Sequence, residues 1–86
     1  MLINGTSNFD YLQGTADADI LVAFEGNDIV YGQKGDDAIA GNEGKDKLNA
    51  GQGNDNISGG ADDDIIWGAK GNDRILGDAG NDSHWR

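Results

Sequence analysis

The chain has 86 residues, of which 15 are glycine, 16 are acidic and 6 are basic, so its formal net charge is −10. It has no cysteine, which excludes a disulfide framework and a thiolate metal site, and its acidity argues against nucleic-acid binding, because phosphate contacts need clustered Lys and Arg. It has no apolar run long enough to span a membrane, and its low apolar content is typical of a disordered chain, or of one that folds once its charge is neutralised.

A nine-residue period runs through the sequence. Gly or Ala stands five residues before each repeated Asp, and an aliphatic residue stands two residues after it in eight of the nine units, with His84 in the last. A fixed register of this kind predicts a structural repeat rather than low complexity. The Asp recurs without insertion or deletion at Asp10, Asp19, Asp28, Asp37, Asp46, Asp55, Asp64, Asp73 and Asp82.

Each unit predicts a turn followed by a short strand. Its first six residues are polar and Gly-rich, and glycine permits the positive φ angles that a tight turn needs. Its last three residues are β-prone, and the middle one points to the opposite face from its two neighbours. Because this middle residue is aliphatic in eight of the nine units, it is expected to point inward. In chain order, strands are expected at residues 11–13, 20–22, 29–31, 38–40, 47–49, 56–58, 65–67, 74–76 and 83–85.

Two consecutive units make one coil, and stacked coils make two parallel sheets with turns along both edges. The units at 5–13, 23–31, 41–49, 59–67 and 77–85 are expected in one sheet, and those at 14–22, 32–40, 50–58 and 68–76 in the other. The fold is therefore all-β, with one domain at residues 5–85, a lead-in at residues 1–4 and a terminal residue 86. The core is expected to be two facing ladders: Leu12, Val30, Leu48 and Ile66 against Leu21, Ile39, Ile57 and Ile75.

Stacking also predicts two columns of carboxylates, because each repeated Asp lies beside the Asp of the unit after next. At a strand spacing of about 4.8 Å these like charges repel one another. A hard divalent cation between successive turns reverses that interaction, and carboxylates with backbone carbonyls are the oxygen ligands that Ca²⁺ prefers. The single histidine and the absence of cysteine argue against zinc or copper.

The units follow the pattern G-G-x-G-x-D-x-U-x, where U is aliphatic, most clearly at residues 32–40, 59–67 and 68–76. This pattern, over residues 5–85, resembles the RTX or haemolysin-type calcium-binding nonapeptide repeat. The resemblance implies a right-handed parallel β-roll that binds several Ca²⁺, up to about seven. It also implies folding coupled to calcium binding and secretion by type I-like export, which needs no N-terminal signal peptide.

The resemblance further implies a ligand set for each gap between turns that stack on one edge. The upper turn supplies the carbonyls of its second and fourth residues and its Asp, and the lower turn supplies the carbonyls of its first and third residues and its Asp. On the first edge, which begins with Asp10, the sets are Phe24, Gly26 and Asp28 with Gly41, Glu43 and Asp46; Asn42, Gly44 and Asp46 with Gly59, Ala61 and Asp64; and Gly60, Asp62 and Asp64 with Gly77, Ala79 and Asp82. On the second edge they are Thr15, Asp17 and Asp19 with Gly32, Lys34 and Asp37; Gln33, Gly35 and Asp37 with Ala50, Gln52 and Asp55; and Gly51, Gly53 and Asp55 with Gly68, Lys70 and Asp73.

The outward strand positions leave a second function open. Tyr31, Trp67 and Trp85 give one sheet an unusually apolar outer face. This face predicts docking of another domain, a second copy of the chain or a glycan, as in an accessory module of a secreted enzyme or adhesin. A purely structural spacer is the third alternative. The sequence has no nucleophile–base arrangement that would indicate an enzyme.

Overall fold

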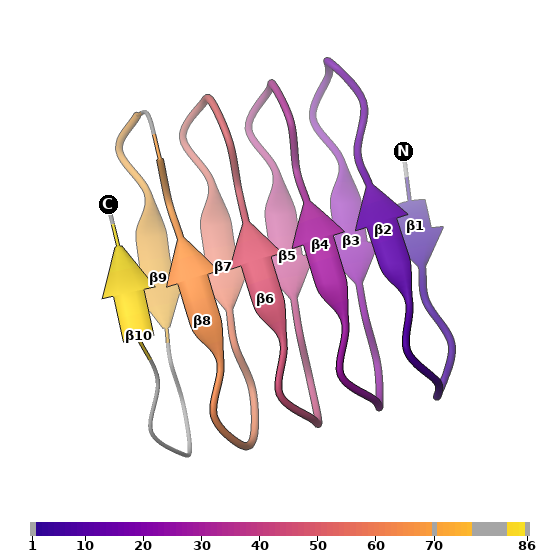
Figure 1. Cartoon of the computed structure of the whole chain (residues 1–86). Coiled ribbons are helices and arrows are strands. Elements are labelled where there is room, and N and C mark those ends of the chain that lie inside the picture. Colours follow the sequence, from indigo (N-terminus) through magenta and orange to yellow (C-terminus); the bar gives the residue numbers. More distant parts are fainter. Residues whose placement is uncertain (1, 70, 77–82, 86) are drawn as a thin grey trace.

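The structure is a computed structural model that describes residues 2–69, 71–76 and 83–85, the last three by their backbone only. Every element in this part of the chain is a strand of three residues. The described residues contain no helix that could cross a membrane. The strands form two layers joined by turns at both ends (Figure 1). They are β1 (Leu2–Asn4), β2 (Tyr11–Gln13), β3 (Ile20–Val22), β4 (Ile29–Tyr31), β5 (Ala38–Ala40), β6 (Lys47–Asn49), β7 (Asn56–Ser58), β8 (Ile65–Trp67), β9 (Arg74–Leu76) and β10 (Ser83–Trp85).

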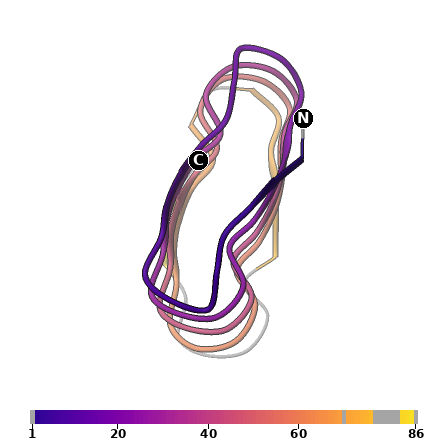
Figure 2. The same ribbon diagram turned by 90° about the vertical axis from the view of Figure 1, so that its right-hand side faces the viewer.

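The two sheets are assembled from alternate strands, as the repeat predicts. One has the order β1-β3-β5-β7-β9 and the other β10-β8-β6-β4-β2. Neighbouring strands are parallel, and each residue pairs with its equivalent one coil further on, for example Leu21 with Ile39 and Leu48 with Ile66. Viewed along the stack, successive coils nearly superimpose as one flattened ring (Figure 2). The predicted parallel β-roll is therefore confirmed.

A single layer of side chains fills the space between the sheets, and the molecule is only 13 Å thick in its shortest dimension. Burying one such aliphatic side chain contributes roughly 1.5–3 kcal/mol. Both predicted ladders lie in this layer, with Ile75 partly buried at its margin. The buried apolar residues are Leu12, Leu21, Ala23, Val30, Ile39, Leu48, Ala50, Ile57 and Ile66.

Strand β1 is an element that the turn-and-strand pattern does not predict. Residues 2–4 follow no Gly-rich turn in the sequence. Ile3 nevertheless pairs with Leu21 and packs against the core. Its position explains this, because residue 3 lies one repeat period before Leu12 and so shares the inward register. At the other end, β10 pairs with β8 as expected, and His84 is in register with Ile66.

Candidate metal centre

The repeated aspartates lie along the two edges where the turns stack, and they link successive coils. In each described pair, one carboxylate oxygen of the later Asp accepts the backbone N–H of the equivalent Asp one coil earlier. The N···O distances are between 2.6 and 3.0 Å. Six of these side chains are at most 3% exposed: Asp19, Asp28, Asp37, Asp46, Asp55 and Asp64.

The second carboxylate oxygen is shielded from solvent and lacks a hydrogen-bond partner at Asp28, Asp37, Asp46, Asp55 and Asp73. In the turns that begin with Gly32, Gly41 and Gly68, this oxygen lies against that first glycine. A Cβ added to Gly41, for example, would lie 2.7 Å from Oδ2 of Asp46. Burying an ionised oxygen without a partner is costly, and a repeated orphan of this kind indicates a missing donor or an ion.

Backbone carbonyls also face the gaps between turns. A Cβ at Gly44 would collide with the carbonyl of Gly26, and one at Gly60 with the carbonyl of Asn42. Carbonyls of the second and fourth residues of a turn therefore face the next turn. The carbonyl of a first residue faces the previous turn, since a Cβ at Gly41 would lie 2.7 Å from the carbonyl oxygen of Gly59. Glycine at these positions permits the close approach of one turn to another.

The turn backbone is strained in a regular way. From residue 23 to residue 73, the second and fourth residues of every turn have positive φ angles. Glycine adopts this region freely, whereas other residues lose roughly 1–2 kcal/mol each. The non-glycine residues held there are Phe24, Gln33, Asn42, Asp62 and Ala69. Strain that recurs at one position and adjoins buried carboxylates is characteristic of a binding site.

Burial strongly perturbs carboxyl groups in the middle of the stack. Desolvation raises the pKa of Asp46 from 3.8 to about 8; the N–H of Asp28 opposes it, and the charges of Asp64, Asp28 and Asp62 add to it. Burial likewise raises the pKa of Asp55 to about 7. It also raises the pKa values of Asp28 and Asp37. Without a cation, burial therefore shifts these carboxyl groups toward the protonated form, most strongly at Asp46 and Asp55.

The first two turns are built differently. The backbone N–H of Thr6 donates to Oδ2 of Asp10 at 2.6 Å, and the Thr6 hydroxyl lies 3.0 and 3.1 Å from the two carboxylate oxygens. Thr15 makes the same contacts with Asp19, at 2.6, 3.1 and 3.0 Å. The N–H of Thr15 is the largest cause that lowers the pKa of Asp19. The repeat motif does not predict these contacts, although Thr in the turn ahead of the repeated Asp is a sequence signal for such a local bond.

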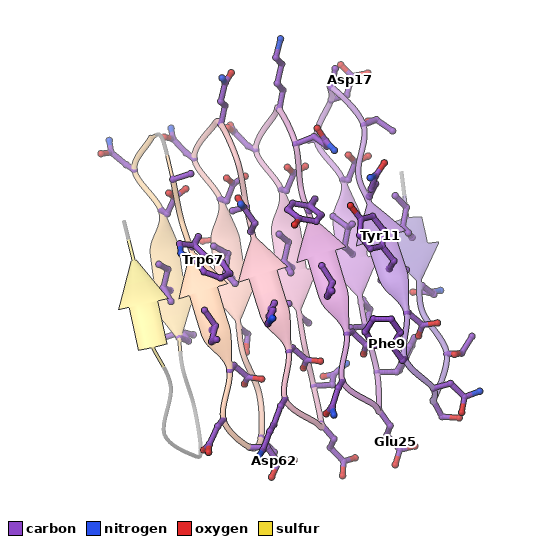
Figure 3. All side chains as sticks on the ribbon, in the orientation of Figure 1. Phe9, Tyr11, Asp17, Glu25, Asp62 and Trp67 are labelled. Atoms are coloured by element: carbon purple, nitrogen blue, oxygen red, sulfur yellow. The ribbon has the colours of Figure 1, made fainter. Side chains whose placement is uncertain are left out.

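A second ladder stabilises the turns from outside and was also missed. Oδ1 of Asn27 accepts the N–H of Lys45 at 2.8 Å. On the other edge, Asp36 accepts the N–H of Asn54 at 2.8 Å, and Asn54 accepts that of Asn72 at 2.9 Å. Asp or Asn at the fifth turn position therefore satisfies a backbone donor of the next coil. Figure 3 shows the polar turns at opposite edges, with Asp17 at one and Glu25 and Asp62 at the other.

Four of the six predicted ligand sets lie between pairs of turns of the same form, with positive φ at the second and fourth residues and hydrogen-bonded Asp residues from successive coils. Lys70 in one of these sets lies outside the described residues. The set that begins with Thr15 has the Thr-bonded turn instead. In the sixth set, Gly77, Ala79 and Asp82 lie outside the described residues. The side chains of His84 and Trp85, which belong to no ligand set, are not described either.

The donors in each gap fit a hard cation. No group of three or more His, Asp or Glu side chains converges among the residues that the structure describes. Each gap instead combines the carboxylates of two repeated Asp residues, here called the register carboxylates, with backbone carbonyls. Ca²⁺ takes six to eight such oxygen ligands and tolerates irregular geometry. The orphaned carboxylate oxygens supply the negative charge that such an ion needs.

These features define a class of protein: a parallel β-roll whose stacked Gly-Asp turns offer oxygen ligands between coils. The profile of the RTX calcium-binding nonapeptide repeat matches the chain in four overlapping copies, at residues 4–39, 22–57, 40–75 and 50–83. The chain therefore belongs to the RTX calcium-binding nonapeptide repeat family. A search of curated proteins and a search of solved structures found no significant match.

Proposed function

We propose that the protein binds Ca²⁺ in the gaps between stacked turns and that this binding is coupled to folding. The observation that carries the proposal is the row of buried carboxylate oxygens without a partner at Asp28, Asp37, Asp46 and Asp55. When bound, the ion supplies positive charge and open coordination positions in each gap. The chain loses stability when these charges are buried without it, because nothing else described in the gaps neutralises them.

The residues of the chain have distinct parts in this proposal. The register carboxylates Asp28, Asp37, Asp46 and Asp55 hold the coils together through one oxygen and ligate through the other. Glycines at the fourth position, such as Gly26 and Gly44, let the carbonyls of one turn approach the next. The ligand sets named above for the turns from residue 23 onward remain the proposed sites.

Folding coupled to calcium suits a secreted protein, and RTX repeats occur typically in such proteins. A chain with net charge −10 and few apolar residues stays unfolded where calcium is scarce. Extracellular calcium modules bind in the range of about 10⁻⁴–10⁻³ M. We therefore propose export of an unfolded chain followed by folding outside the cell.

The direct test is far-UV circular dichroism of the whole chain at neutral pH, first with chelator and then with increasing Ca²⁺. The expected result is a disordered spectrum that converts to β structure, reversed by chelator. Mg²⁺ at the same concentration is the control, since it demands octahedral geometry and dehydrates reluctantly. A spectrum that Ca²⁺ leaves unchanged would reject the proposal.

A second candidate function is carbohydrate docking through the outer face of the β2-containing sheet. An open hollow of about 480 Å³ lies there, lined in part by Tyr31, Lys47, Asn49 and Trp67. Tyr31 and Trp67 share one register, with Asn49 between them. Two aromatic rings separated by an amide present apolar faces and a hydrogen-bonding group, which suits a sugar chain.

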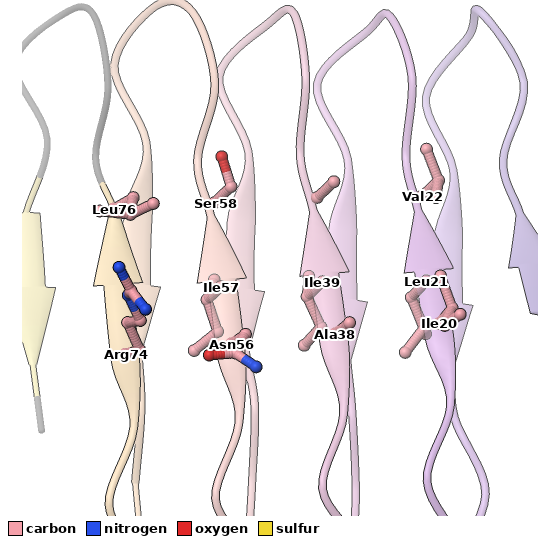
Figure 4. Close-up of a pocket in the computed structure, with 11 residues that line it drawn as sticks. Ile20, Leu21, Val22, Ala38, Ile39, Asn56, Ile57, Ser58, Arg74 and Leu76 are labelled. Atoms are coloured by element: carbon pink, nitrogen blue, oxygen red, sulfur yellow. The ribbon is translucent and has the colours of Figure 1, made fainter.

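The opposite sheet has a hollow of about 420 Å³ (Figure 4), but its lining includes no aromatic residue. NMR titration of the calcium-loaded protein with neutral and acidic oligosaccharides tests the candidate. Shifts confined to the Tyr31–Trp67 face and lost in Trp67→Ser support it. Unchanged spectra with both classes of sugar reject it, and Leu76→Ser on the opposite sheet is the control.

A further inference from the structure

We propose that the turns at residues 5–10 and 14–19 are closed by threonine rather than by calcium, so that both columns of ions begin at the second coil. The inference rests on the proposed function and deepens it, because it says which gaps take an ion. It divides the described turns into two chemical classes: two Thr-closed turns, and the calcium-ready turns from residue 23 to residue 73.

In a Thr-closed turn, protein donors already occupy the carboxylate oxygen that is an orphan elsewhere. Oδ2 of Asp10 accepts the N–H of Thr6, and Oδ2 of Asp19 accepts the N–H of Thr15, both at 2.6 Å. The threonine hydroxyls lie within 3.1 Å of the same carboxylates. An ion would have to break these charge-assisted bonds before it could use that oxygen.

The hydroxyl also closes the turn from within. Oγ1 of Thr6 accepts the N–H of Asn8 at 3.1 Å, and Oγ1 of Thr15 accepts the N–H of Asp17 at 3.2 Å. These contacts form a compact local turn of the kind that Ser and Thr favour. Each threonine therefore acts as donor to the carboxylate and acceptor from the backbone.

The backbone conformation differs between the two classes in the same way. Every turn from residue 23 to residue 73 has positive φ at its second and fourth residues. At the corresponding positions of the Thr-closed turns, residues 6, 8, 15 and 17 do not have positive φ. The fourth residue does not cause this difference, because Asp62 occupies that position at φ 72° in a calcium-ready turn. Threonine at the second position is common to both turns, which each stand first on their edge.

The consequence is a definite number of ions. The repeats create seven gaps between turns, and a Thr-closed turn is the upper wall of two of them. Four gaps lie between two calcium-ready turns, and the structure describes these turns except for Lys70. The seventh is completed by residues 77–82, which the structure does not describe. We therefore expect four ions per chain, or five if that gap also binds, and not six or seven.

Native mass spectrometry and equilibrium dialysis of the whole chain with Ca²⁺ measure this number. Four or five ions support the inference, whereas six or seven overturn the threonine closure. Fewer than four, including none, contradicts the assignment of calcium to the calcium-ready turns and so rejects the proposed sites themselves. The wild-type count needs no variant, so it does not depend on any variant's folding.

A matched pair of substitutions tests whether threonine causes the difference. Thr15→Gly removes the hydroxyl and permits positive φ at the second position, so we expect one additional ion. Ala69→Gly makes the same kind of change in a calcium-ready turn, where φ is already 64°, and should leave the count as in the wild type. A Thr15→Gly protein that shows the calcium-induced β spectrum but binds no additional ion would overturn the inference.

Discussion

Acid is expected to stabilise the calcium-free β-roll, and neutral pH to unfold it. In the folded chain the pKa of Asp46 is about 8 and that of Asp55 about 7, whereas an unfolded chain releases these protons near pH 3.9. The folded state therefore binds more protons than the unfolded state between these values, and its stability falls as the pH rises. The contribution is fully present below about pH 4 and is lost once the pH passes about 8.

The size of the effect follows from the same values. At about 1.4 kcal/mol per pKa unit, Asp46 contributes about 6 kcal/mol and Asp55 about 4 kcal/mol. Small domains have total stabilities of roughly 5–15 kcal/mol, so a loss of this size is enough to unfold one. Asp19 acts in the opposite sense, because Thr15 lowers its pKa and its contribution is lost as the pH falls. Stability of the calcium-free roll should therefore be greatest near pH 4.

Far-UV circular dichroism of calcium-free protein across this pH range measures the effect, with urea titrations giving the free energy of unfolding. Asp46→Asn imitates the protonated carboxyl group, so this variant should keep β structure to a higher pH without calcium. Asp63→Asn changes an exposed fifth turn position at which Asn is also an acceptor, as Asn54 shows, so this variant should follow the wild type. A calcium-free chain whose β structure increases from acid to neutral pH, or is missing at every pH, refutes the reasoning.

Three further substitutions test separate parts of the structure. Asp55→Asn removes a carboxylate that two gaps share, so native mass spectrometry should detect up to two fewer ions, while Asp63→Asn loses none. Gly44→Ala introduces a Cβ at φ 103° against the carbonyl of the preceding turn. This substitution should lower the free energy of unfolding by roughly 1–3 kcal/mol and raise the Ca²⁺ concentration at the folding midpoint. Lys45→Ala, at the neighbouring position, should change neither. Leu48→Ala leaves a cavity in the single core layer and should lower the free energy of unfolding in saturating Ca²⁺ by about 2–5 kcal/mol, and an unchanged urea midpoint would contradict the assigned core.

The fold could be predicted because one period determines both the strands and their partners. The regular recurrence of Asp places Leu12, Leu21 and their successors in a single inward register, and two units per coil determine which strands pair. Strand β1 escaped prediction because position 1, one repeat period before Asp10, is Met rather than Asp. A pattern that relies on the repeated Asp does not detect a strand that has another residue in its place.

The candidate site could be predicted only in its residue types. The repeat identifies the Asp columns, but it does not say which atom each oxygen meets. That Oδ1 of Asp46 accepts the N–H of Asp28 while Oδ2 is left without a partner depends on the separation and tilt of stacked coils. In the motif, Thr6 and Thr15 stand where the pattern has glycine, so they look like departures that weaken the turn. In the structure, their hydroxyls contact the carboxylates of Asp10 and Asp19.

Under the proposed function, the two oxygens of each carboxylate make calcium binding and coil stacking interdependent. In the middle of a column, Asp46 holds the backbone of the previous coil through Oδ1 and offers Oδ2 to the gap. Loss of an ion leaves an unpaired charge on the side chain that also links the two coils, so both contacts weaken together. Because each repeat contacts only its neighbours, such losses propagate from coil to coil along a column. We expect the turns closed by threonine to end that propagation, because Thr6 and Thr15 hold the carboxylates of Asp10 and Asp19 by protein hydrogen bonds.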